Sequence, residues 1–259
     1  EYLYEDAQGW HTEIIDTMGS IGKTTAIQLD SSGNPHVVYL NIELLKLRYA
    51  TKTSGSWVIT SIIDDVLDVE GLAMVLDSMD RPHVCYGRIN QGTIVCSHYD
   101  GSDWRWAIID DGFNPFGKGP RIGLDIDADD HLHLAYTARI DAHLKYAEYN
   151  GDMWITGTVD ANNILGSFAD LHLDDAGQPH IVYTSHYDND LTTLKYARDD
   201  GQEWQIETVD ITPNSGLYPS LGFNQAGHPV ISYYAFNPDD KVMFAEYDGS
   251  TWQTEIADT

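Results

Sequence analysis

Six of the seven tryptophans in this chain recur at a nearly constant spacing, and no other feature restricts the possible folds as strongly. Successive members lie 47, 47, 50, 50 and 48 residues apart: Trp10, Trp57, Trp104, Trp154, Trp204 and Trp252. The surrounding text repeats as well, because LKYAEYNGDMWITGTVD at residues 144–160 matches LKYARDDGQEWQIETVD at residues 194–210. A period of this size predicts a series of equivalent structural units, each packed against its neighbours.

Each unit has the pattern of four short strands. A segment such as LDDAGQPHIVY (residues 173–183) combines two strands with a turn of the D-x-x-G kind. A second turn, such as Asp200-Gly201, precedes the tryptophan. β-Branched and aromatic residues dominate between the turns, and no segment has helical periodicity. Short, evenly spaced strands with the same turns in every unit predict the four-stranded antiparallel blades of a β-propeller.

We predict an all-β fold: a five-bladed β-propeller with an extra N-terminal hairpin, forming a single domain over residues 1–259. The hairpin covers residues 1–16, and the blades cover approximately residues 17–64, 65–110, 111–160, 161–210 and 211–259. The sequence contains five pairs of first and second strands but six hairpins of third and fourth strands. A six-bladed ring needs two further strands, so we expect five blades. The extra hairpin then either caps the ring or belongs to a longer array.

The units resemble the repeats of secreted bacterial β-propellers of the Asp-box, or sialidase-type, superfamily. The resemblance covers essentially the whole chain and rests on the turns YDGSDW, YNGDMW, DDGQEW and YDGSTW, at residues 99–104, 149–154, 199–204 and 247–252. In each turn Asp or Asn is adjacent to Gly, whereas an Asp-box separates its Asp and Gly by one residue. The resemblance implies the propeller fold. It does not imply sialidase activity, because the arginine triad, tyrosine nucleophile and acid of sialidases match no positions here.

The chain is strongly acidic, with 14 Lys and Arg against 41 Asp and Glu and a formal net charge of −27 at pH 7. This charge argues against a nucleic-acid-binding or anionic-membrane-binding surface, because both require clustered basic residues. No apolar run is long enough to span a membrane, and the first residues do not form a signal-peptide pattern. We expect an extracellular or cell-surface protein from which any leader has been removed.

The two cysteines, Cys85 and Cys96, flank a ten-residue segment. If that segment is a hairpin turning at Asn90-Gln91, the cysteines lie directly opposite each other. A cross-strand disulfide is then possible, as expected in an oxidising compartment. The alternative is that they are two small apolar strand residues.

The repeats supply an internal comparison: a residue present in every blade is explained by the packing that blades share. The second strand carries a histidine in four of the five blades, with Val230 in the fifth. The four are His36, His83, His133 and His180. We expect them to be structural, as neutral imidazoles hydrogen-bonded across blades. The tyrosine three residues later, present in all five blades, is structural by the same test.

The acidic run DIDADD (residues 125–130) has the alternating oxygen atoms of a calcium-binding loop. In the repeat alignment, however, residues 127–130 coincide with the first turn of each blade. The glycine and the closing glutamate of an EF-hand loop are also missing. We predict no metal site and no cofactor.

Residues that do not follow the repeat concentrate in the loops between blades and between second and third strands, which we expect to share one rim. The basic and aromatic residues in or beside these loops are Lys23, Arg88, Lys118, Arg121, Arg139, Phe113, Phe116 and Phe236, joined by His186 and Tyr187. Guanidinium groups and aromatic faces on an acidic molecule suit a sugar or a small anionic ligand. The alternative is that loops simply hold polar residues.

The innermost strand of the fourth blade carries Asp170 and His172, two residues apart and therefore on one side of the strand. Asp125 comes from the innermost strand of the preceding blade. Carboxylates beside a histidine in a confined channel shift one another's pKa and supply an acid or a base. The alternative is a hydrogen-bonded polar plug.

Two functions fit these patterns. The first is an extracellular glycan-binding propeller, lectin-like or adhesive, that uses the inter-blade loop face without catalysis. The second is a carbohydrate-active enzyme, a polysaccharide lyase on uronate-containing glycans or, failing that, a glycoside hydrolase. In the lyase, Arg121 or Arg139 neutralises the sugar carboxylate, and His186, His172 or Tyr187 abstracts the C5 proton. A protein-interaction platform is a third possibility that no residue specifically favours.

Overall fold

A computed structural model of the chain describes residues 1–18, 21–64, 69–111, 122–138, 143–162, 168–187, 191–236 and 240–258. These residues form one two-stranded and five four-stranded antiparallel sheets. The only helical element among them is a single 3-10 turn, η1 (Ile89–Gln91). In this part of the chain, no helix has the length and apolar character needed to cross a membrane.

The two-stranded sheet is the extra hairpin, and the five larger sheets are the blades, numbered here in chain order. The hairpin consists of β1 (Tyr2–Asp6) and β2 (Gly9–Glu13). Blade 1 consists of β3 (Ile21–Leu29), β4 (Pro35–Asn41), β5 (Lys46–Thr53) and β6 (Ser56–Asp64). Blade 2 consists of β7 (Val69–Leu76), β8 (Pro82–Arg88), β9 (Thr93–Tyr99) and β10 (Trp104–Asp110).

The remaining blades have the same up-and-down order. Blade 3 consists of β11 (Gly123–Ile126), β12 (Leu132–Ala138), β13 (His143–Tyr149) and β14 (Trp154–Asp160). Blade 4 consists of β15 (Ala169–Leu173), β16 (Pro179–Tyr187), β17 (Leu191–Asp199) and β18 (Trp204–Asp210). Blade 5 consists of β19 (Leu217–Phe223), β20 (Pro229–Ala235), β21 (Lys241–Tyr247) and β22 (Trp252–Asp258).

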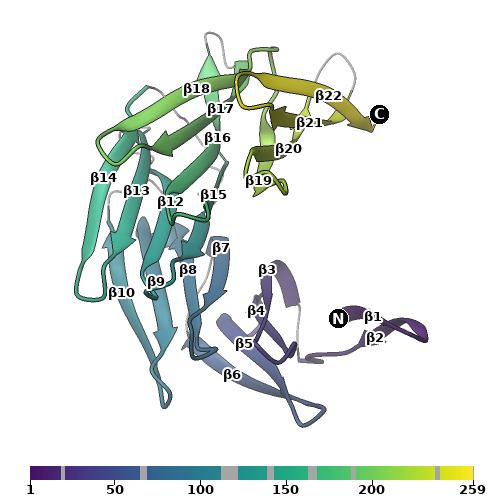
Figure 1. Cartoon of the computed structure of the whole chain (residues 1–259). Coiled ribbons are helices and arrows are strands. Elements are labelled where there is room, and N and C mark those ends of the chain that lie inside the picture. Colours follow the sequence, from purple (N-terminus) through teal and green to yellow (C-terminus); the bar gives the residue numbers. More distant parts are fainter. Residues whose placement is uncertain are drawn as a thin grey trace.

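The blades are arranged as in a β-propeller, with their first strands innermost and each first strand in contact with that of the next blade. Five blades and a separate hairpin agree with the sequence prediction. Figure 1 shows that the five blades follow an open arc and not a closed ring, with blade 5 at one end. The hairpin β1–β2 lies at the other end, beside blade 1.

Each blade packs on the next through its second strand. The second-strand residue that precedes the repeated tyrosine faces the following blade, and it is fully buried in the first four blades: Val38, Cys85, Ala135 and Val182. It joins a cluster made from the first two strands of that following blade, as Val182 does with Leu221, Ile231 and Tyr233. The core therefore consists of separate clusters between neighbouring blades, consistent with a repeat protein.

A polar contact crosses most of these interfaces. The phenol of the repeated tyrosine donates a hydrogen bond to an aspartate at the end of the preceding fourth strand, as Tyr183 does to Asp160 at 2.7 Å and Tyr136 to Asp110 at 2.9 Å. A third-strand cation binds the same carboxylate, as Lys195 does at 3.1 Å from Asp160. Blade 1 makes the equivalent contacts to Asp16, directly after the hairpin.

The turns form two rims. We call the edge that carries the turns between first and second strands and between third and fourth strands the turn rim, and the opposite edge the loop rim. On the turn rim, aspartate side chains accept backbone hydrogen bonds, as Asp100 does from the amides of Ser102 and Asp103 at 2.8 Å. Gly101 takes φ of 101°, a backbone conformation that glycine adopts at low cost.

Candidate functional site: a cavity between two blades

The repeated second-strand histidines form hydrogen bonds within their own blades. The phenol of Tyr49 lies 2.6 Å from Nδ1 of His36, and that of Tyr146 lies 2.5 Å from Nδ1 of His133. Nε2 of His36 faces Asp30, in the first turn of the same blade, at 3.6 Å. In blades 1, 3 and 4 the histidine is thus structural, as expected, but the prediction that the four histidines are hydrogen-bonded across blades is wrong. In each case the tyrosine lies on the third strand of the histidine's own blade, and the aspartate lies in the first turn of that blade.

Burial keeps two of these histidines neutral near pH 7. It lowers the pKa of His36 and His180, while the nearby Asp30 and Asp174 oppose the shift without cancelling it. A neutral imidazole protonated at Nε2 points its N–H toward the turn aspartate and accepts the phenol's hydrogen bond at Nδ1. These residues thus supply neither a charge nor a free base.

The third-strand tyrosine has a second contact, with the next blade. Its ring lies against the repeated tryptophan of that blade, with centroids 5.4 Å apart for Tyr49 and Trp104 and 5.2 Å for Tyr146 and Trp204. The interplanar angles of 70° and 64° are those of edge-to-face pairs. This tyrosine therefore fills the outer part of the boundary between two blades.

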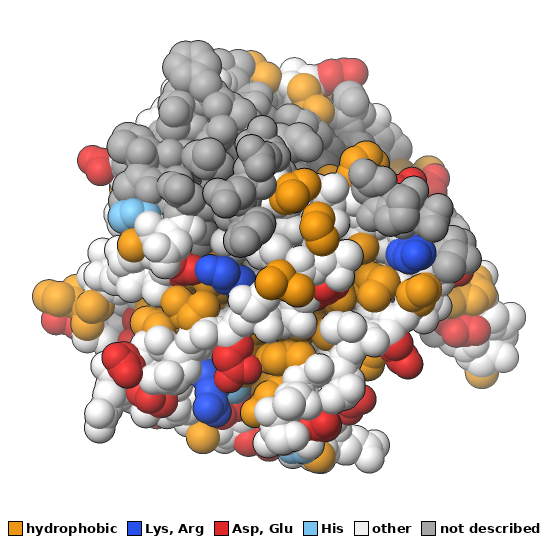
Figure 2. Space-filling view, turned by 90° about the horizontal axis from the view of Figure 1, so that it is seen from above, with side chains coloured by type: hydrophobic (Ala, Val, Ile, Leu, Met, Phe, Trp, Pro, Cys, Tyr) orange, Lys and Arg blue, Asp and Glu red, His pale blue; other side chains and the backbone are white. Residues whose placement is uncertain are grey.

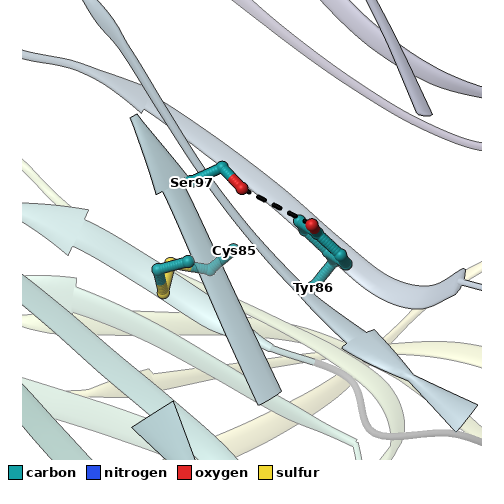
Figure 3. Close-up of a disulfide and its surroundings, with 4 residues drawn as sticks. Cys85, Tyr86 and Ser97 are labelled. Carbon is teal, nitrogen blue, oxygen red and sulfur yellow. Dashed lines mark hydrogen bonds between the residues drawn. A yellow bond between two sulfur atoms is a disulfide. The ribbon is translucent and has the colours of Figure 1, made fainter. Parts of the chain in front are cut away.

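Blade 2 breaks this pattern. Cys96 occupies the position of the third-strand tyrosine, and it forms a disulfide with Cys85, its register partner on the neighbouring strand. The cross-strand bond considered from the sequence is therefore present. Figure 3 shows the disulfide on one face of the sheet, with Tyr86 and its hydrogen bond to Ser97 on the other.

A cavity of about 490 Å³ lies at this place, between blades 2 and 3 on the turn rim. A cysteine side chain is much smaller than tyrosine, so the ring of Trp154 has no third-strand tyrosine against it. Blade 3 contributes Trp154 and Tyr149, whose rings lie 5.5 Å apart, together with Leu132. The cavity thus has an aromatic wall on one side.

Blade 2 supplies a polar wall. Its members are Asp77, Arg81, His83 and His98. The buried Asp77 accepts a 2.7 Å hydrogen bond from Nε of Arg81, and Nε2 of His83 lies 3.4 Å from the same oxygen. No described residue accepts a hydrogen bond from the terminal nitrogens of Arg81. The carboxylate thus fixes the guanidinium and leaves its outer donors for a ligand.

The two imidazoles of this wall stack on each other, with ring centroids 5.7 Å apart and planes 20° from parallel. Burial lowers the pKa of both His83 and His98, so both are neutral near pH 7. Burial on its own would raise the pKa of Asp77, but the hydrogen bonds from Arg81, Met79 and His83 together outweigh it and the pKa is lowered. These four side chains therefore combine one cation, one anion and two neutral groups that donate and accept hydrogen bonds, and the carboxyl groups of Asp100, Asp130 and Asp152 also line the cavity.

The three predicted channel residues also come together. Nδ1 of His172 lies 3.4 Å from Asp125 Oδ2, which also accepts a 2.9 Å hydrogen bond from the Leu173 amide. Asp170 in turn accepts from the Leu221 amide at 2.9 Å. Each carboxylate thus links its inner strand to that of the next blade. The Asp125 hydrogen bond raises the pKa of His172 despite its partial burial.

Of the loop-rim residues predicted to bind a ligand, the structure places Arg88 at the end of β8 and Phe236, 54% exposed, after β20. They belong to blades 2 and 5, which are not neighbours. Outside the described residues lie Phe113, Phe116, Lys118, Arg121 and Arg139. Only the backbone is described for Lys23 in β3 and for His186 and Tyr187 in β16. A loop-rim site therefore stays a prediction.

The charge of the described surface is mainly acidic. In the face shown in Figure 2, Lys and Arg side chains are few and well separated, and Asp and Glu side chains are scattered toward the margin. No basic cluster is visible among the coloured residues of that face.

The acidic run at residues 125–130 covers the end of β11 and, from Asp127 to Asp130, the first turn of blade 3. Asp127 accepts hydrogen bonds from the amides of Asp129 and His131, and Asp130 accepts from the Ser78 amide and hydroxyl at 2.8 and 2.6 Å. Within the described part of the chain, no group of three or more His, Cys, Asp or Glu side chains is placed to hold a metal ion.

Sequence reasoning missed the cavity, although the signal was present. Aligned on the tryptophans, Cys96 stands where other blades have Tyr49, Tyr146, Tyr196 or Phe244. His98 stands where the others have Thr51, Glu148, Arg198 and Glu246. Two departures from the repeat on one strand of blade 2 mark the cavity wall.

Comparisons with known proteins give the fold alone. The sequence matches no protein-family model and no curated protein. The BP39L lectin from Burkholderia pseudomallei is 15% identical, with 95% of this chain and 74% of that chain covered and a TM-score of 0.62. The Hadza microbial sialidase Hz136 is 12% identical, with coverage of 87% and 54% and a TM-score of 0.54. An ulvan lyase of polysaccharide lyase family PL25 is 11% identical, with coverage of 90% and 77% and a TM-score of 0.52. This chain therefore shares its blade architecture with a lectin, a sialidase and a polysaccharide lyase.

Proposed function

We propose that this protein is a glycan-binding β-propeller that takes a sugar unit into the cavity between blades 2 and 3. The observation that carries the proposal is the exchange of the third-strand tyrosine for Cys96, which leaves the ring of Trp154 open opposite a polar wall. The shared fold with a lectin supports the same class of ligand.

The chemistry of the cavity suits a sugar. The C–H face of a pyranose ring packs on an indole, and sugar hydroxyls both donate and accept hydrogen bonds. The neutral His98 and His83 match hydroxyls in both directions, and Arg81 adds fixed donors. Asp77 balances the charge of Arg81, and Asp100, Asp130 and Asp152 add further carboxyl groups, so a neutral sugar fits better than an anionic one.

The test is a glycan array followed by titration calorimetry with the best ligand. Cys96→Tyr in a Cys85→Ala background restores the side chain found in blades 1, 3 and 4, and it should fill the cavity and abolish binding. The matched control is Cys85→Ala with Cys96→Ala, which removes the disulfide without filling the cavity and should retain binding. His98→Thr, the blade 1 residue, should weaken binding roughly tenfold, equivalent to about 1.4 kcal/mol.

Two results would contradict the proposal: a blank array for the wild type, or equal affinity in the filled and unfilled variants. If Phe236→Ala or Arg88→Ala abolished binding while the cavity variants retained it, the ligand would instead occupy the loop rim predicted from the sequence.

A lyase acting on uronate glycans is a second candidate, favoured by the contact between Asp125 and His172. The carboxylate orients the imidazole and makes it more basic, as proton abstraction requires. Unsaturated products absorb in the ultraviolet, so a panel of uronate polysaccharides tests this directly. The lyase proposal predicts an absorbance rise that His172→Gln eliminates; no rise with the wild type contradicts it.

The disulfide also supports the proposed location. Cross-strand disulfides persist in oxidising compartments and are rare in the cytosol. An extracellular or cell-surface protein, as predicted from composition, fits both the disulfide and a glycan ligand.

A further inference from the structure

We infer that the open arc has a docking surface for one more β-hairpin, with the sequence pattern of the repeat's first and second strands. This hairpin adds to β1 and completes a sixth blade between blade 5 and blade 1. The inference is independent of the glycan cavity, which lies between blades 2 and 3.

The hairpin β1–β2 is the outer half of a blade. Trp57 Nε1 donates a 3.1 Å hydrogen bond to Glu13, as Trp252 does to Glu207 between blades 4 and 5. Tyr39 and Arg48 bind Asp16 in the way that Tyr183 and Lys195 bind Asp160. The residues after Trp10 therefore interact with blade 1 in the same way as the fourth strand of each complete blade interacts with the blade that follows it.

The third-strand position of this half blade is also filled. Tyr2 packs edge-on against Trp57 with ring centroids 5.4 Å apart, as Tyr196 does against Trp252 at 5.0 Å. In blades 1, 3 and 4 the equivalent phenol binds the histidine of the adjacent second strand. The Tyr2 phenol has no hydrogen-bond partner among the described residues. Its geometry thus predicts a histidine on the incoming strand.

The inner side of blade 1 lacks the cover that every later blade has. Ile27 on the first strand is 51% exposed. Its equivalents in the other four blades, covered by the preceding blade, are at most 8% exposed: Met74, Leu124, Leu171 and Leu221. Beside Ile27, a cavity of about 270 Å³ is lined by β1, β3 and β4, where the inner strands of a preceding blade would lie.

Blade 5 has the complementary open face at the other end of the arc. Ser232 is exposed, whereas the residues in its position in blades 1 to 4 are fully buried by the next blade.

One edge of β1 pairs with β2, and the other edge corresponds to the edge of the third strand that pairs with the second strand in every complete blade. Strand addition at this edge repeats the pairing of second and third strands present in all five blades, and it extends the blade-to-blade interface already present four times.

The experiment uses a synthetic hairpin peptide with the sequence of residues 169–187 of this chain, added to the intact protein. Hydrogen exchange should slow at the amides of Tyr2–Asp6, and the melting temperature should rise by several degrees at saturating peptide. A scrambled peptide should have neither effect. Tyr2→Phe should weaken peptide binding several-fold, because it removes the partner of the peptide histidine.

Ile27→Asp should abolish peptide binding, and because Ile27 is exposed the variant should still fold. The matched control, Ile206→Asp, changes another exposed apolar strand residue and should bind peptide normally. The inference fails if β1 gains no protection at millimolar peptide or if Ile27→Asp binds as well as the wild type. It also fails if sedimentation shows a dimer whose β1 amides are already protected, because a second copy would then occupy the edge.

Discussion

The phenol of Tyr183 donates a 2.7 Å hydrogen bond to Asp160 across the boundary between blades 3 and 4, and Lys195 approaches the same carboxylate to 3.1 Å. The Asp160 side chain is 1% exposed, so its charge is compensated by these two partners and by hydrogen bonds from the backbone N–H and the side-chain Nδ2 of Asn162. The contact joins the outer parts of the two blades, whose inner strands are linked by the contacts of Asp125 with His172 and the Leu173 amide.

Asp160→Asn should destabilise the protein by about 3 kcal/mol, because it removes the negative charge that faces Lys195 and leaves one acceptor oxygen where Tyr183, Lys195 and Asn162 now share two. Chemical denaturation measures the change. Asp64→Asn is the control at the end of the fourth strand of blade 1, where the carboxylate is exposed and forms an ion pair with Lys46, and it should cost less than 1 kcal/mol. Equal losses in the free energy of unfolding would mean that the buried contact contributes no more to stability than the exposed ion pair.

Gly123→Ala should destabilise the protein by about 3 kcal/mol or more, because the added Cβ would lie 2.4 Å from the backbone nitrogen of Leu171. Neither inner strand can move without disturbing its own sheet. Gly157→Ala places its Cβ in open space and should change stability little. Thermal unfolding compares the two; a tolerated Gly123→Ala would show that the inner strands β11 and β15 can separate.

Reduction of the disulfide should lower the free energy of unfolding by about 2–3 kcal/mol, since the bond closes a loop with a sequence separation of 11 residues. The melting temperature should fall on addition of a thiol reductant. The Cys85→Ala, Cys96→Ala variant should start from the lower value and be insensitive to the reductant. A wild type that melts identically in both conditions would contradict this.

Two histidines should affect the pH dependence of stability in opposite directions. Burial lowers the pKa of His180, so its contribution is complete above the ordinary value of about 6.5 and is lost as the pH falls below it. The Asp125 hydrogen bond raises the pKa of His172, so its contribution is complete below about 6.5 and is lost as the pH rises through the higher folded-state pKa.

Denaturation curves between pH 5 and pH 8 check both signs. His180→Gln should remove part of the stability loss on acidification, and His172→Gln should be more destabilising at pH 5.5 than at pH 8. If the two variants changed the pH profile in the same direction, one of the two assignments would be wrong.

The blades could be predicted from the sequence because the same pattern of strands and turns occurs in every unit. Each strand and turn is therefore indicated by several copies of one pattern. The structural role of His180 could be predicted for the same reason. Its partners could not, because the bond to Tyr196 depends on which residues of neighbouring strands face each other.

The cavity was harder to foresee because it arises from a missing side chain. Cys96 is informative only when it is aligned with Tyr146 and when the contact of that tyrosine with the next blade is known. The open arc was not predicted either. Five complete blades suggest a closed ring, but the contacts of Glu13 and Asp16 place the hairpin as an outer half blade.

The exchange of Tyr for Cys at position 96 has a consequence for valency. Under the proposed function, the cavity beside Cys96 provides one sugar-binding site, and a single site binds glycans without avidity. The register pairs Ala135 with Tyr146 in blade 3 and Val182 with Tyr196 in blade 4, the positions that Cys85 and Cys96 occupy in blade 2. Transferring the cysteine pair and its neighbouring histidine to those blades would convert a monovalent receptor into a multivalent one, with the number of sites set by the number of exchanged pairs.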